Sequence, residues 1–157
     1  MTSSFRGFSA PEKVSYSKEA SEELGRDYWL VTEGFSYYIG KKGSNQWVHV
    51  PAGFLTDGAS VPHPLWSVIP PWGPWGQAAI VHDYLCEYLS ITVDGKPQAI
   101  SRQYADLLFL EMLIVLDVPE LKRKMMYAAV AAYTATLASG EPSSPLEKRA
   151  VEAALAR

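Results

Sequence analysis

The stretch YWLVTEGFSYYIGKKGSNQWVHV, residues 28–50, decides the fold that the sequence predicts. It holds three short runs rich in aromatic and β-branched residues, which are typical of strands. A Glu-Gly pair separates the first two runs and is compatible with a hairpin, and a Gly- and Lys-rich turn precedes the third. The sequence therefore predicts a small N-terminal antiparallel sheet with strands at 28–32, 35–39 and 46–50.

The segments on either side of this sheet differ in character. Residues 1–14 carry little pattern, and we expect them to form an N-terminal arm or an added edge strand. Residues 51–76 are predicted to form a long loop with repeated Pro, Gly and Trp, and a loop of this length in a compact domain is usually functional. Trp66, Trp72 and Trp75 in this loop are expected to pack over the core or to bind a partner subunit, because tryptophans are costly to leave in water.

The second half of the chain has helical composition, and its expected helices span 77–89, 101–117 and 119–139. Ser101 can cap the second of these helices, and Pro119 suits the first turn of the third. A Ser-Pro-Leu-Glu run has the spacing of a capping box and opens a terminal helix, 145–157, which either packs on this domain or lies apart from it. We therefore predict a single domain, 1–157, of the α+β class, with the sheet first, then the Pro/Trp-rich loop, then three to four helices.

Composition excludes several classes of protein. With 14 Lys and Arg against 17 Asp and Glu, the chain has a formal net charge of −3 and lacks the clustered cations that nucleic-acid binding requires. The one cysteine, Cys86, excludes an internal disulfide. The uncharged run 125–139 would span only about 22 Å as a helix, short of the roughly 30 Å of a bilayer core. We therefore expect a soluble protein without a signal peptide or a transmembrane segment.

His82 and Asp83 are adjacent in the helix predicted at 77–89. Neighbouring side chains on a helix point about 100° apart, so these two diverge and do not chelate one ion in a simple way. They can still serve one cavity, with His82 holding a proton and Asp83 a cation. The alternative is that His82 is a core histidine that pins the preceding loop, while Asp83 lies on a solvated face.

Asp106 lies on the next predicted helix, between Ala105 and Leu107. If the two helices pack together, its carboxylate can hydrogen-bond one ring nitrogen of His82 and leave the other nitrogen as a base. This pattern makes His82 and Asp106 the candidate catalytic residues. The alternative is a helical ion pair between Asp106 and Arg102, four residues earlier.

Asp57 is the candidate partner of Asp83 in a metal site. Two carboxylates offer hard oxygen ligands suited to a divalent cation, Ca²⁺ or Mg²⁺. The alternative is that Asp57 or Ser60 caps a helical turn that begins near Pro62. Ser60 is a weak candidate nucleophile because the Gly-x-Ser-x-Gly elbow is absent, and Cys86 is expected to be a packing residue.

Three separated motifs resemble the DUF1353 family: VPAGFLTDGASVP at 50–62, AAIVHDYL at 78–85, and the Ser-Arg and Ala-Asp pairs within 101–106. The likeness spans about 50–112 and departs at Cys86, where the family usually shows an aromatic residue. The family consists of small proteins of unknown function that are common in tailed bacteriophages and prophages. The resemblance therefore implies a phage or prophage origin, with the protein in the host cytoplasm or in the virion, and implies no reaction.

A looser likeness concerns the helices alone. His82, Asp83 and Asp106 are similar in order and type to the helical pair of phospholipase A2, in which a His-Asp dipeptide and a later Asp form a dyad beside a calcium ion. The disulfides and the glycine-rich calcium loop of that family are missing here, so this likeness is an analogy and not membership.

Two hypotheses of different classes follow for the function. The first is a metal-dependent hydrolase acting on lipid or cell-wall material, in which His82 activates water and a bound cation polarises the scissile group. The second is a non-catalytic virion component, for example a tail-associated one, in which the His/Asp cluster is structural and the Trp-rich loop binds a partner subunit. The first predicts an open cavity beside His82, and the second predicts sealed residues with exposed aromatics on one face.

Overall fold

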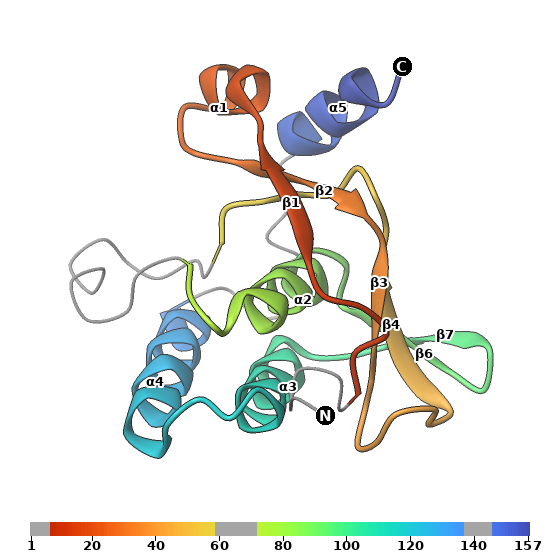
Figure 1. Ribbon diagram of the computed structural model, residues 1–157, viewed down its shortest axis with the longest axis vertical. Helices are drawn as coiled ribbons and strands as arrows, with labels where there is room; N and C mark the ends of the chain where they lie inside the picture. Colours follow the sequence, from red (N-terminus) through yellow and green to blue (C-terminus); the bar gives the residue numbers. More distant parts are fainter. Residues whose placement is uncertain (1–6, 59–71, 137–145) are drawn as a thin grey trace.

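The computed structural model describes residues 7–58, 72–136 and 146–157 (Figure 1). Its described strands form two antiparallel sheets. One has the order β1-β2-β5 and consists of Lys13–Tyr16, Trp29–Glu33 and Leu55–Thr56. The other has the order β3-β4-β6-β7 and consists of Phe35–Tyr38, Gln46–Val50, Ser90–Val93 and Lys96–Ala99. The helices α1 to α5 span Lys18–Leu24, Gly76–Tyr88, Arg102–Val115, Glu120–Thr136 and Leu146–Leu155.

The predicted α+β class is confirmed, but the predicted first hairpin is wrong. The two runs around the Glu-Gly pair are β2 and β3, and they belong to different sheets. Only Gly34 separates them, whereas a tight hairpin needs a loop of about two residues. A Cβ on Gly34 would lie 3.0 Å from the Val50 carbonyl oxygen, so glycine lets the chain pass close to β4 as it crosses between sheets.

Four elements were not predicted, namely α1, β5, β6 and β7, and local signals explain all of them except β5. Helix α1 begins after Ser17, whose side chain accepts a hydrogen bond from the Ala20 N–H, and ends at Gly25 in a left-handed conformation. The hairpin β6–β7 turns at Asp94-Gly95, both with positive φ, a pair that favours tight hairpins. Strand β5 lies inside the predicted loop. Strand β1 pairs with β2 at the edge of the sheet, so the last residues of the segment 1–14 lie in an edge strand.

The C-terminal helices are where the sequence places them. Ser101 caps α3 by accepting a hydrogen bond from the Tyr104 N–H at 3.0 Å. Pro119 immediately precedes α4, and the predicted end of that helix near 139 lies outside the described residues. In the described residues, the structure contains no helix that is both long and apolar enough to span a bilayer.

Helix α2 lies in the interior and is covered on both sides (Figure 1). It packs against α3 on one side and against β4 and β5 on the other. Most of its residues are buried, including Ala78, Ile80, Val81 and Leu85. Polar side chains on opposite faces of α2 therefore enter two separate buried environments.

The terminal helix α5 packs beside α1 (Figure 1). Val151 and Leu155 of α5 cover a small second core that contains Ala20, Tyr28 and Leu55. This contact places α5 over β5 and next to the segment that carries Asp57.

Candidate functional site

One face of α2 carries a buried hydrogen-bond network centred on Asp106. His82 Nε2 lies 2.7 Å from Asp106 Oδ1, and the Thr134 hydroxyl donates to Asp106 Oδ2 at 2.6 Å. The three residues come from α2, α3 and α4, and their exposed fractions are 6% for His82, 2% for Asp106 and 7% for Thr134. The predicted approach of Asp106 to His82 is therefore confirmed, and the network ties three helices together.

Arg102, the alternative partner predicted for Asp106, contacts Thr134. Arg102 donates from Nε to the Thr134 hydroxyl at 3.3 Å, and its guanidinium lies over the Tyr133 ring. Arg102 thus supports the network through Thr134.

The environment of His82 favours its protonated form. Burial alone would lower the pKa of the imidazole, but the charge of Cys86 and the hydrogen bond and charge of Asp106 raise that pKa from 6.5 to about 10. The ring also packs on Phe109, with centroids 4.7 Å apart. At neutral pH this arrangement is a buried imidazolium–carboxylate pair, which suits a structural role better than proton abstraction.

Cys86 brings a third potential metal ligand to the same place. Its sulfur lies 3.4 Å from His82 Nε2, and ligand atoms of His82, Cys86 and Asp106 all lie within 4.8 Å of one another. These donor types suit zinc. Two ligands on a tetrahedral zinc are roughly 3.3 Å apart, so the 2.7 Å separation between His82 and Asp106 would have to open before an ion entered.

The opposite face of α2 carries Asp83, which faces β5. Burial and the charge of nearby Asp57 raise the pKa of Asp83 to about 7, although a hydrogen bond from Thr56 and the charge of Lys148 oppose this. Asp83 Oδ2 is inaccessible to solvent and has no hydrogen-bond partner among the residues that the structure describes. A buried carboxylate oxygen without a partner is uncommon and marks this cluster as a candidate functional site.

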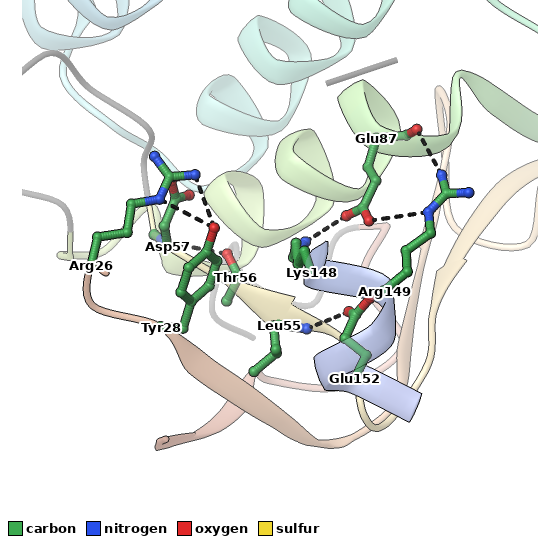
Figure 2. Close-up of polar contacts among 10 residues, drawn as sticks. Arg26, Tyr28, Leu55, Thr56, Asp57, Glu87, Lys148, Arg149 and Glu152 are labelled. Carbon is green, nitrogen blue, oxygen red and sulfur yellow. Dashed lines mark hydrogen bonds and ion pairs between the residues drawn. The ribbon is translucent and has the colours of Figure 1, made fainter. Parts of the chain in front are cut away.

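Asp57 itself is held by a cation from the neighbouring strand region. Arg26 Nη2 lies 3.4 Å from Asp57 Oδ2 and 2.9 Å from the Tyr28 hydroxyl (Figure 2). The fold brings Asp57 and Asp83, the predicted pair, near enough for the charge of Asp57 to raise the pKa of Asp83. The divalent cation assigned to this pair stays a prediction, and Arg26 and Lys148 already supply positive charge beside it.

The remaining predicted residues divide between the core and the undescribed segment. Trp75 is 3% exposed in the core, and Trp72 packs edge-on against Trp29 with centroids 5.3 Å apart. Core packing, one of the two expected uses, thus holds for these two tryptophans. Trp66 and Ser60 lie outside the described residues, as does the helical turn that Asp57 was expected to cap near 62.

Sequence reasoning missed the acidic residue Glu87 and the polar face of α5. Glu87 is 1% exposed, and Lys148 Nζ lies 2.5 Å from its Oε2 (Figure 2). Arg149 Nε lies 3.7 Å from Glu87 Oε1, and Glu152 accepts a hydrogen bond from the Leu55 N–H at 2.8 Å. The spacing of Asp83 and Glu87, four residues apart on one helical face, was a signal for this cluster; nothing local marked Lys148.

The fold and the two clusters define an α+β protein whose internal helix α2 presents His82 to Asp106 of α3 on one face and carries the acidic residues Asp83 and Glu87 on the other. The family model described as "Protein of unknown function (DUF1353)" matches residues 29–130, and the chain belongs to this family. It is also similar to "Uncharacterized protein y4jT" of Sinorhizobium fredii (strain NBRC 101917 / NGR234), with 37% identity over 86 residues. The match covers 54% of this chain and 23% of that relative, so the chain spans less than a quarter of the relative's length. No solved structure matches the chain.

Proposed function

We propose that this DUF1353 protein is a non-catalytic component of a larger assembly, in which the His82–Asp106–Thr134 network is structural. The observation that carries the proposal is the burial of the network, with His82 and Asp106 6% and 2% exposed. A general base must reach substrate or water and must be unprotonated at the working pH. His82 is enclosed, and its raised pKa keeps it protonated at neutral pH.

Exposed apolar residues on the two packed helices α3 and α4 support an interaction role. Leu107 and Ile114 are two turns apart on α3, and Leu121 and Met125 are one turn apart on α4, which packs against α3. The exposed fractions of these residues and of one aromatic residue on α4 are substantial: Leu107 51%, Ile114 49%, Leu121 74%, Met125 38% and Tyr133 48%. Exposed apolar residues gathered on neighbouring helices suit contact with the apolar surface of another subunit. A phage tail is one setting for such an assembly, as the family resemblance suggests.

A pair of surface variants tests this proposal. Leu121→Glu should abolish association, measured as molar mass by light scattering over a concentration series and as incorporation into the purified particle. Leu146→Glu changes an equally exposed leucine, 83% exposed on α5, and should leave association unchanged. A hydrolytic activity that disappears in His82→Asn, with the melting temperature preserved, would overturn the proposal.

The unpartnered Asp83 oxygen favours a second candidate, a hydrolase centred on the acidic side of α2. In this candidate mechanism Asp83, with its pKa near 7, donates a proton to the leaving group. Asp57, held by Arg26, is the ionised carboxylate that accepts a proton from the attacking water. Lipid and cell-wall material are the substrates to assay first. Loss of an observed activity in both Asp57→Asn and Asp83→Asn, with and without added Ca²⁺ or Mg²⁺, would support this candidate and show whether a cation is required.

A further inference from the structure

The ammonium group of Lys148 is buried between a carboxylate and an aromatic ring, and we call this enclosed position the pocket. Lys148 is 4% exposed, and its Nζ lies 2.5 Å from Glu87 Oε2 and 4.0 Å from the centre of the Phe54 ring. Asp83 adds a second carboxylate whose charge acts on the same ammonium. An acid and an aromatic face around one cation form the arrangement by which proteins recognise ammonium ligands.

The walls of this pocket and its occupant come from different parts of the chain. Phe54, Asp83 and Glu87 all lie within 29–130, the segment that the family model matches. Lys148 lies outside that segment, on the ten-residue helix α5. The matched segment therefore supplies an acidic, aromatic pocket, and a helix outside that segment supplies the cation.

The two cations of α5 reach Glu87 in different ways. Lys148 enters it fully, whereas the side chain of Arg149 is 42% exposed and reaches Glu87 from outside, lying over the Tyr88 ring at 4.7 Å. The compact ammonium of Lys148, on its narrow alkyl stem, fits the enclosed position, and the broad planar guanidinium of Arg149 lies at the solvent-exposed edge.

We propose that Phe54, Asp83 and Glu87 form a binding site for a primary alkylammonium group, the chemistry of a lysine side chain, and that α5 is the ligand this chain supplies to itself. Asp83 acts on this ammonium through its charge, and its Oδ2 is inaccessible to solvent and has no hydrogen-bond partner among the described residues. A lysine of another polypeptide would be held by the same contacts when α5 is displaced. This inference concerns the other face of α2 from the His82 network and stands independently of the proposed assembly role.

Chemical rescue of the full-length chain tests the proposal. Lys148→Ala removes the ammonium and leaves Glu87 buried without it, and it should lower the melting temperature by about 6–20 °C. Millimolar n-butylammonium chloride should restore at least half of that loss, whereas n-butanol at the same concentration should restore little. The double variant Lys148→Ala/Glu87→Gln should not respond to n-butylammonium.

A matched control separates this effect from general salt stabilisation. Lys124→Ala removes an exposed lysine, with 68% side-chain exposure, that pairs with Glu120, and its melting temperature should not respond to n-butylammonium. If Lys148→Ala does not fold in buffer, its refolding yield with n-butylammonium against n-butanol gives the same comparison. Equal effects of the two compounds, an equal response of Lys124→Ala, or no response at all would each overturn the proposal.

Discussion

Replacing Asp106 by alanine tests how much the buried network contributes to stability. Asp106 accepts from His82 at 2.7 Å and from Thr134 at 2.6 Å, so its loss leaves an imidazolium and a hydroxyl without their acceptor. Breaking a buried charge pair by removing one partner costs about 3–5 kcal/mol. We expect Asp106→Ala to reduce the free energy of unfolding by that amount, a large share of the roughly 5–15 kcal/mol of a typical domain.

The assay is urea unfolding at pH 7, followed both by far-ultraviolet circular dichroism and by tryptophan fluorescence. Thr134→Val removes one of the two donors to Asp106 and should cost about 1–3 kcal/mol, because Asp106 Oδ2 then stays buried without a hydrogen bond from Thr134. The double variant should cost less than the sum of the two, because both substitutions break the same hydrogen bond. Asp27→Ala, at an exposed hydrogen bond to Tyr16, is the surface control and should change stability by less than about 0.5 kcal/mol. A loss below about 1 kcal/mol in Asp106→Ala would refute the assignment of a stabilising role to this network.

The titrating groups and the three potential metal ligands give three further predictions. The pKa of His82 is about 10 in the folded state against 6.5 in the unfolded state, so its contribution to stability is complete below pH 6.5 and is lost as the pH rises towards 10. Urea unfolding at several pH values should show the free energy of unfolding falling over this range, and His82→Gln should reduce that fall. The raised pKa of Asp83, about 7 against 3.8, makes its ionised form unfavourable in the folded state, so Asp83→Asn should raise stability at pH 8 and leave it nearly unchanged at pH 3. The protein should be isolated without stoichiometric zinc, because His82 and Asp106 are at hydrogen-bond distance; zinc that is present by elemental analysis and absent in Cys86→Ser would contradict this.

The helical half of the fold could be predicted because its signals are local. Ser101 and Pro119 mark helix starts by their own backbone chemistry, and the structure places helices after both. The distribution of strands between two sheets depends on long-range pairing, which no local pattern records. Gly34 shows the difference, since the same residue that suggested a hairpin instead permits a close crossing over β4.

The candidate site was predictable where helical spacing controls it. The divergence of His82 and Asp83 follows from helix geometry, and the apolar neighbours of Asp106 indicated that its carboxylate faces the core. The cations beside the acidic face come from Arg26 and Lys148, which lie 57 and 65 residues from Asp83 in the chain. Such contacts depend on tertiary docking, so no local pattern indicated that these two positive charges lie beside Asp83.

The hydrogen bond from the Leu55 N–H to Glu152 has a consequence for how this protein behaves in concentrated solution. Strand β5 is an edge of its sheet, and an edge N–H that points outward can donate a hydrogen bond to a strand of another molecule. Glu152 occupies that N–H with a negatively charged side chain, and α5 covers the strand. Helix α5 therefore protects the sheet against edge-to-edge aggregation, and Glu152→Ala should aggregate faster than the wild type on mild heating.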